Sequence, residues 1–219
     1  SSYAVMVSGK SITLELYGHK LSSDASGATV YIGGTGALRV RDSRGGGAIK
    51  NENGLDAVGV YGTFVMESGA LVSDGGYALY NYNYAGTMYG TSTILSGSLT
   101  GYDRGIANCG VLTIHDATIA STANDGVDLD NSGYLAITGE VEIAYLYLAD
   151  GTDAPGVPDR GTLVLLAGAK FKVNEDVEAE DGATIIVHAG ASVTGIADVS
   201  APGSGFNTYI YDGGDWVIQ

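Results

Sequence analysis

The sequence predicts an all-β protein that folds as one right-handed parallel β-helix, an elongated solenoid. The first observation is a recurring glycine that stands directly before an alternating apolar strand, at spacings between 20 and 32 residues. Repeats of this length that cannot bury their apolar side alone are typical of solenoids, in which neighbouring repeats cover one another. The marker glycines are Gly36, Gly62, Gly90, Gly110, Gly133, Gly161, Gly182 and Gly214.

The second observation is a column of apolar residues at a constant distance from these glycines. The residues four positions after the glycines are Val40, Met66, Ile94, Ile114, Ile137, Leu165, Ile186 and Ile218. The residues two positions after them are Leu38, Phe64, Ser92, Leu112, Leu135, Leu163, Thr184 and Trp216. Side chains two apart on a strand share a face, so both columns are expected to face the core.

The third observation is that most repeats contain two further short strands. A second strand places Leu71, Leu99, Ile119, Phe171 and Val193 inward. A third strand ends in an aliphatic residue, any residue and asparagine, which predicts a ladder of stacked amides. Its members are Asn51, Asn81, Asn108 and Asn131. We therefore expect eight to nine coils of three strands each, in a single domain over residues 1–219. A β-sandwich is the alternative fold, but it would not keep a constant phase over eight repeats.

Composition excludes several classes of function. The formal net charge is −15; residues 1–110 carry 8 acidic and 7 basic side chains, and residues 111–219 carry 17 and 3. Nucleic acids and anionic membrane surfaces require a cationic partner, so neither is expected as a ligand. No run approaches the roughly 20 apolar residues of a membrane span, so no membrane insertion is expected. The single cysteine, Cys109, lies in an apolar run and is expected to fill the core.

Four segments resemble a known repeat. Residues 11–21 (SITLELYGHKL) are similar to the ITLDLNGHTI rung of bacterial cell-surface proteins, and residues 38–49, 62–71 and 110–119 follow the same pattern. The chain thus resembles the pectate-lyase-like right-handed β-helix repeats of large, adhesin-like surface proteins, especially those of gut Firmicutes. The resemblance implies an extracellular location and attachment through other parts of a larger parent protein, of which this chain is expected to be a fragment. It leaves activity open, because the same coil occurs in lyases, hydrolases, adhesins and spacers.

One segment resembles a catalytic element. Residues 124–128 (NDGVD) are similar to the NTDGID element of polygalacturonase-type hydrolases, in which paired carboxylates act as general acid and base. The Asp-Asp pair, the Gly-His-Gly and the Arg-x-Lys of that family are absent from the sequence. We therefore expect a turn here, and we assign no catalytic residue.

This segment and the strand that follows it contain weak candidates for a metal site, whereas the acidic run at 175–181 is expected to be a solvated loop. Asp125, Asp128 and Asp130 are weak candidates for calcium, which prefers oxygen ligands. Asp128 and Asp130 alternate around Leu129, so both are expected to face the solvent. No other cofactor is expected.

Tyrosine marks the most distinctive region. Extra residues interrupt the repeat at 52–61, 82–89 and 144–160, and insertions in a solenoid often form its binding side. Seven tyrosines concentrate near the first two: Tyr61, Tyr77, Tyr80, Tyr82, Tyr84, Tyr89 and Tyr102. Exposed tyrosines offer a large contact area at a low entropic cost, so we expect them to bind a ligand. The alternative is a tyrosine ladder that only stiffens the stack.

Three functions are compatible with these features. The first is a non-catalytic cell-surface module that serves as an adhesin or as a receptor for a host glycoprotein, immunoglobulin or glycan. The second is a polysaccharide lyase or glycoside hydrolase of the β-helix type. The third is a structural stalk without a ligand of its own.

Overall fold

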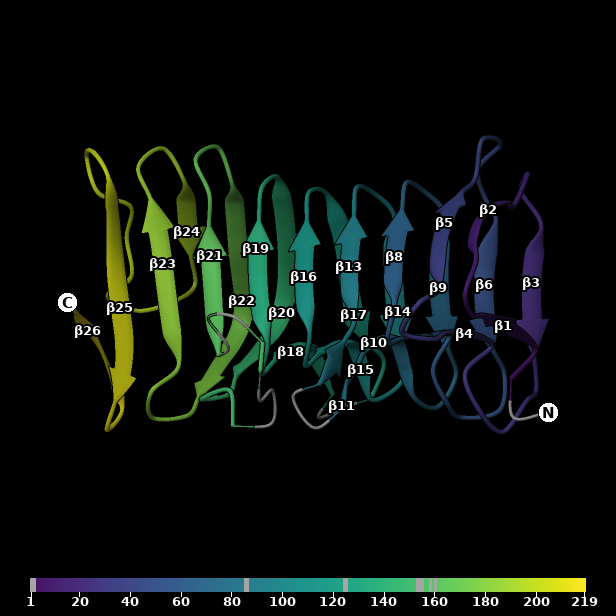
Figure 1. Ribbon diagram of the computed structural model, residues 1–219. Helices are drawn as coiled ribbons and strands as arrows, with labels where there is room; N and C mark the ends of the chain where they lie inside the picture. Colours follow the sequence, from purple (N-terminus) through teal and green to yellow (C-terminus); the bar gives the residue numbers. More distant parts are fainter. Residues whose placement is uncertain (1–2, 85–86, 124–125, 153–155, 158, 160) are drawn as a thin grey trace.

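The chain coils into a parallel β-solenoid of about 7 turns, and the described part contains no helix. The computed structural model describes residues 3–84, 87–123, 126–152, 156–157, 159 and 161–219. In Figure 1 the front strands point upward, the chain passes over the top to the back, and it advances from right to left, so the coil is right-handed. The predicted fold is confirmed, although eight to nine coils were expected. None of the described segments forms a helix able to span a membrane.

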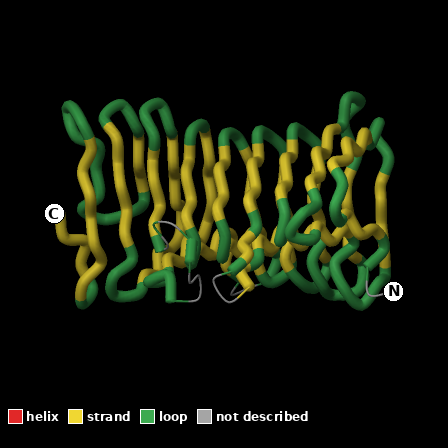
Figure 2. The backbone as a smooth tube through the Cα atoms, viewed as in Figure 1, coloured by secondary structure: helices red, strands yellow, loops and turns green. Residues whose placement is uncertain are grey.

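Three strands per turn build three faces, which Figure 2 shows as aligned strands joined by loops. The first face consists of β2(Ser11–Glu15), β5(Ala37–Arg41), β8(Thr63–Met66), β13(Thr91–Ile94), β16(Val111–Ile114), β19(Tyr134–Ile137), β21(Thr162–Leu165) and β23(Thr184–His188). The second consists of β3(Lys20–Ser23), β6(Ala48–Asn51), β9(Ala70–Ser73), β14(Ser98–Gly101), β17(Ala117–Ser121), the start of β20(Glu140–Leu148), the start of β22(Lys170–Ala179) and β24(Ser192–Thr194). The third consists of β1(Val5–Val7), β4(Val30–Ile32), β7(Val58–Val60), β10(Tyr77–Asn81), β15(Arg104–Asn108), β18(Val127–Asn131) and the ends of β20 and β22.

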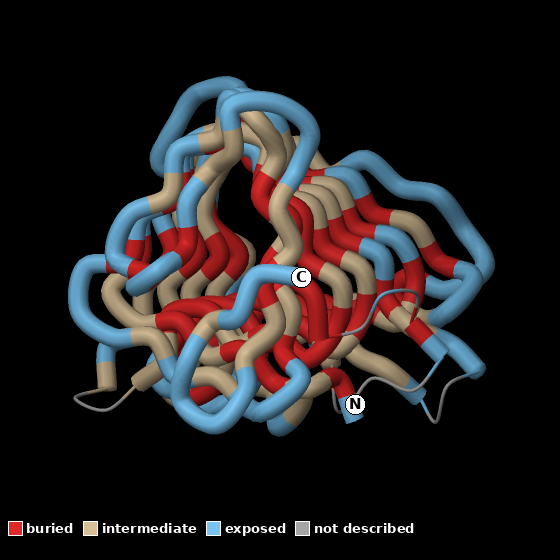
Figure 3. The backbone as a smooth tube through the Cα atoms, turned by 90° about the vertical axis from the view of Figure 1, so that its left-hand side faces the viewer, coloured by how far each residue is buried: buried red, intermediate tan, exposed pale blue. Residues whose placement is uncertain are grey.

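The core lies between these three faces. Seen along the solenoid axis, buried backbone surrounds the interior and exposed backbone concentrates at the outer corners (Figure 3). The predicted column from Val40 to Leu165 runs in register through the first face, and Leu14 and Val187 extend it. The prediction for Ile186 is wrong, because β23 is displaced by one residue relative to its glycine. Its buried residues are therefore Ile185 and Val187.

A hairpin rather than a further coil covers the C-terminal end. Strand β25(Phe206–Asp212) pairs antiparallel with β23, and β26(Asp215–Ile218) pairs antiparallel with β25. Gly213 and Gly214 both adopt positive φ, 61° and 111°, which allows the tight reversal between the two strands. Trp216 and Ile218, the last members of the two predicted columns, therefore lie in this hairpin and not in a further coil, so the expectation for them is wrong. The hairpin accounts for part of the difference between the eight to nine coils expected and the number observed.

Close contact between coils explains several marker glycines. Gly90 and Gly110 are not among the residues with positive φ. A Cβ at Gly110 would lie 2.3 Å from the carbonyl oxygen of Gly90, and a Cβ at Gly90 would lie 2.2 Å from Oδ1 of Asn81. Glycine is needed here because successive turns approach too closely for any side chain.

A ladder of buried asparagines stands at this same corner. Asn81 Nδ2 donates to Asn108 Oδ1 at 2.8 Å, and Asn108 Nδ2 donates to Asn131 Oδ1 at 2.7 Å. Ser92, which interrupts the second apolar column, donates its hydroxyl to Asn81 Oδ1 at 3.0 Å. These bonds satisfy polar groups that have no access to water, as buried amides require.

The fourth predicted member of the ladder belongs elsewhere. Asn51 ends β6 on the second face, where it pairs with Ser23 and Ser73. Its Nδ2 donates to the carbonyl of Gly27 at 2.9 Å. Both corners need a polar side chain that bonds to the backbone, so the same short sequence pattern occurs at two different corners.

Replacing Asn108 by alanine should destabilise the fold strongly. The change removes the bonds to Asn81 and Asn131, a bond from the Gly110 N–H at 3.2 Å and a bond to the Tyr134 carbonyl at 3.0 Å. Because the partners of Asn108 would be left buried without a hydrogen bond, the free energy of unfolding should fall by about 3 kcal/mol. Urea denaturation measures this loss. Asn174→Ala, an exposed position, is the matched control and should cost less than about 0.5 kcal/mol. Equal losses in the two variants would contradict a structural role for the ladder.

Candidate binding site

The segment 52–61, predicted to be an insertion, contains a regular strand of the third face. Val58 and Val60 of β7 are fully buried and pair with Leu79 and Asn81 of β10. On the other side, β7 pairs with β4, so that Tyr31, Gly59 and Tyr80 occupy one outward-facing column. The prediction of an inserted loop is wrong because valine replaces the expected asparagine at the end of this strand.

The other two predicted insertions differ in outcome. The predicted insertion at 82–89 contains two short strands, β11(Asn83–Tyr84) and β12(Met88–Tyr89), which pair antiparallel with each other. Residues 144–160 are not wholly an insertion, because residues 144–148 complete β20 and pair with β18 and β22. Residues 153–155, 158 and 160, including both prolines of this segment, lie outside the described residues.

Six tyrosine rings form a continuous row on the third face. The ring centroids are 4.5 Å apart for Tyr3 and Tyr31, 5.8 Å for Tyr31 and Tyr61, and 4.6 Å for Tyr61 and Tyr82. Tyr80 contacts Tyr82 at 3.8 Å, and Tyr77 meets Tyr80 edge to face at 5.2 Å. We call these six residues the tyrosine row. Tyr61 and Tyr82 follow the paired residues Val60 and Asn81, so their spacing is near the strand separation of about 4.8 Å. Tyr31 pairs with Met6 and Gly59 and joins the row from a different register position.

A groove of about 360 Å³ runs beside this row, and we call it the tyrosine groove. Its lining consists of Tyr3, Tyr31, Tyr61, Tyr82, Tyr84 and Met88. The hairpin forms one wall with two exposed side chains, Tyr84 at 62% and Met88 at 42% exposure. Met88 reaches back across the coils to Gly34, where a Cβ would lie 1.9 Å from its sulfur. The groove is thus assembled from four coils and one insertion.

The predicted tyrosines divide into three groups. Tyr61, Tyr82 and Tyr84 line the groove, whereas Tyr77 and Tyr80 continue the row beyond Tyr82 and are not among the lining residues. Tyr89 pairs with Asn83 inside the hairpin, and Tyr102 follows β14 at another corner, outside the groove lining. Sequence reasoning missed Tyr3 and Tyr31. The matching of Val30-Tyr31-Ile32 with Val58-Gly59-Val60 could have revealed the second of them.

A buried carboxyl group lies beneath the row. Tyr82 Oη donates to Asp56 Oδ2 at 2.9 Å, and the Tyr77 N–H donates to Oδ1 at 3.4 Å. Burial raises the pKa of Asp56 to about 6, and the bonds from Tyr82 and Tyr77 offset part of this effect. Burial beside this carboxyl also raises the pKa of the Tyr82 hydroxyl, so Tyr82 stays a neutral donor. The Tyr82 ring rests on Gly59, where a Cβ would lie 2.9 Å from it.

The aspartates proposed as calcium ligands have other partners. Asp128 is buried, and its carboxylate accepts hydrogen bonds from the N–H groups of Ser121 and Ala144, each at 2.5 Å. Asp130 forms an ion pair with Arg104 Nε at 2.8 Å. The expectation that Asp128 faces the solvent is wrong, because it holds the corner between the second and third faces. Asp125 lies outside the described residues, and among the residues that the structure describes there is no cluster of three or more acidic, histidine or cysteine ligands.

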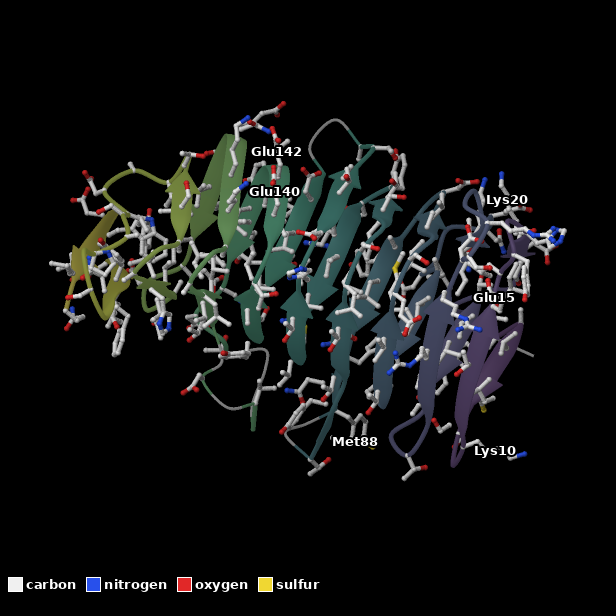
Figure 4. All side chains as sticks on the ribbon, turned by 90° about the horizontal axis from the view of Figure 1, so that it is seen from above. Lys10, Glu15, Lys20, Met88, Glu140 and Glu142 are labelled. Carbon is white, nitrogen blue, oxygen red and sulfur yellow. The ribbon has the colours of Figure 1, made fainter. Side chains whose placement is uncertain are left out.

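A second groove, of about 440 Å³, crosses the second face and contains Asp116, Glu140 and Glu142. Glu140 and Glu142 project side by side, on the side of the molecule away from Met88 (Figure 4). Glu142 binds Lys172 at 2.7 Å, and this bond, with one from Asn174, lowers the pKa of Glu142. Glycoside hydrolysis requires one carboxylic acid with a raised pKa, so Glu142 is suited to an ion pair rather than to proton donation.

Cys109 also differs from expectation. It follows the inward Asn108 and lies next to Tyr82 in register, half-buried on the outer side of the third face, so it does not fill the core.

Comparison of the chain with known protein families, with curated proteins and with solved structures finds no match. The description of the site therefore rests on its own geometry.

The buried Asp56 should make stability depend on pH. Its folded-state pKa of about 6 lies above its ordinary value of 3.8, so its favourable contribution is complete below about pH 3.8 and is lost as the pH rises through 6. Asp56→Asn does not titrate. Its stability relative to the unmodified protein should therefore rise by about 2 kcal/mol between pH 4 and pH 8, measured by urea denaturation.

The matched control for this measurement is Asp74→Asn. Asp74 forms an ion pair with Lys50 at the surface and is half exposed. Its replacement should show no rise of this kind, because surface ion pairs contribute little. A constant stability difference between Asp56→Asn and the unmodified protein at all pH values would contradict the assigned titration.

Proposed function

We propose that the chain is a non-catalytic binding module of a bacterial cell-surface protein, and that it holds a host protein or glycan in the tyrosine groove. The observation that carries the proposal is the groove itself. Four coils and the hairpin bring together five tyrosines and one methionine that lie up to 85 positions apart in the sequence. Tyrosine and methionine are enriched where proteins bind other molecules.

Rigidity favours this site as a binding surface. Each ring of the tyrosine row contacts at least one other ring, and Tyr82 is fixed further by its bond to Asp56. Side chains that are already ordered lose little conformational entropy when a ligand binds. The row therefore stiffens the coil and prepares one wall of the groove at the same time.

The hairpin favours a binding module over a plain stalk. Stacked tyrosines alone would serve to stiffen a stalk. The insertion at 82–89 adds Tyr84 and Met88, two large apolar side chains that are more than 40% exposed. Exposing such side chains brings no stability to the coil, whereas it supplies contact area for a ligand.

The extracellular setting is supported by the resemblance of residues 11–21 and three further segments to surface-protein repeats. A net charge of −15 favours solubility and disfavours anionic ligands. A polysaccharide lyase or hydrolase remains the second candidate, because the second groove carries three carboxylates on an open face. Asp128, which the resemblance to hydrolases pointed to, is engaged with backbone N–H groups.

Replacing the exposed wall of the groove should weaken binding. Mucin, immunoglobulin and a glycan array are the probes, and surface plasmon resonance is the measurement. Tyr84→Ala and Met88→Ala should each reduce affinity for the bound probe about 10-fold, as expected for loss of a contact of about 1.4 kcal/mol.

Tyr102→Ala is the matched control, because Tyr102 is half exposed and lies outside the groove lining. Its affinity should equal that of the unmodified protein, and all three variants should show the same thermal unfolding midpoint within a few degrees. Binding that survives both groove replacements would refute the proposed site. Absence of binding to every probe would favour the stalk.

A further inference from the structure

We infer that the tyrosine groove holds an uncharged, extended peptide segment rich in proline, in the polyproline II conformation, rather than a carbohydrate. This inference rests on the proposed function and names the ligand class of the same site. Three properties of the groove support it: its charge, the orientation of its rings and its length.

Among the described residues, the lining contains no charged side chain, because its six members are tyrosine or methionine. Asp56, whose carboxyl bonds to Tyr82, is buried. A charged group in the groove would lose hydration without gaining a partner, which costs several kcal/mol. Acidic glycans and acidic peptides are further disfavoured by the net charge of −15.

The orientation of the rings disfavours sugars. Tyr3 and Tyr31 are stacked with 19° between their planes, and Tyr61 and Tyr82 with 7°. The ring faces inside each pair are therefore covered, whereas sugar rings bind to open aromatic faces. The ring edges of these pairs and the hydroxyl groups of Tyr31 and Tyr61 remain for a ligand, whereas the Tyr82 hydroxyl donates to Asp56. Tyrosine hydroxyls can donate hydrogen bonds to peptide carbonyls, which polyproline II leaves free because it has no internal hydrogen bonds.

The length of the groove fits a short peptide. Four of its five tyrosines come from β1, β4, β7 and β10 or the residues near them, and these four strands are consecutive neighbours in the third face. Three strand spacings of about 4.8 Å give about 14 Å along the solenoid axis. Polyproline II advances 3.1 Å per residue, so about five residues span this distance.

The row is least tightly stacked between Tyr31 and Tyr61, and this is the place where a ligand side chain could pack. Tyr31 and Tyr61 are tilted by 56° with their centroids 5.8 Å apart, so the stack opens between the two closed pairs. Tyr84 and Met88 stand opposite as the apolar wall. Proline rings pack well in such aromatic-lined grooves, and a preformed polyproline II segment loses little entropy on binding.

Fluorescence polarisation with labelled nine-residue peptides tests the inference on the full chain. The probes are (Ala-Pro-Pro)₃, its matched control (Ala-Gly-Gly)₃, the acidic (Asp-Pro-Pro)₃, and neutral cello- and chito-oligosaccharides as competitors. We expect (Ala-Pro-Pro)₃ to bind at least 10-fold more tightly than either other peptide, and the oligosaccharides not to compete. Tyr61→Phe, which removes one hydroxyl but keeps the ring, should weaken binding about 5-fold, while Tyr102→Phe should not change it.

The possible failures are distinguishable. If neutral oligosaccharides bind in a Tyr84-dependent manner and (Ala-Pro-Pro)₃ does not, the inference is overturned and the proposed function stands. If (Ala-Pro-Pro)₃ binds but Tyr61→Phe and Tyr102→Phe are indistinguishable from the unmodified protein, the groove is not the peptide site and the inference is overturned. If neither peptides nor oligosaccharides bind at millimolar concentration, the inference is overturned, and the proposed function fails with it only if mucin, immunoglobulin and the glycan array also show no Tyr84-dependent binding.

Discussion

The register between successive parallel strands is the constraint on which the rest of the structure depends. Each strand of the first and third faces pairs residue for residue with the strand of the next coil, so matching side chains stack along the axis. Inside, this stacking aligns Asn81, Asn108 and Asn131 within hydrogen-bonding distance of one another. Outside, it places Tyr61 beside Tyr82 and puts Tyr31 in the same column as Tyr80. The buried ladder and part of the exposed row are therefore two consequences of one arrangement.

The candidate site depends on a local departure from that regularity. Gly59 occupies the column between Tyr31 and Tyr80, and its missing side chain leaves space for the Tyr82 ring. The insertion after Asn81 then brings Tyr84 and Met88 over the earlier coils. A rigid scaffold that carries variable insertions is a common way to place function on a repeat protein. In this chain the insertion and the missing side chain act on the same groove.

The sequence predicted the first face well and the third face poorly, for a physical reason. On the first face, two large inward residues per strand and a glycine before them make the phase readable, as at Leu112 and Ile114. On the third face, asparagine marks the coils from Asn81 onward, whereas earlier coils end in Ile32 and Val60. Asn51 has the same apolar–any–asparagine pattern but ends a strand of the second face. The third-face strand β4, which contains Tyr31, was therefore not recognised from the sequence, and only part of the groove was predicted.

Disulfide crosslinking tests the register of the third face most directly. In a Cys109→Ser background, the pair Tyr61→Cys and Tyr82→Cys occupies neighbouring positions, because Val60 pairs with Asn81. The pair Glu52→Cys and Tyr82→Cys would be neighbours only if Asn51 were aligned with Asn81. Two cysteines can be bridged when their Cα atoms lie within about 7 Å. Under mild oxidation, mass spectrometry should detect a disulfide between positions 61 and 82 and none between 52 and 82; the reverse result would contradict the account.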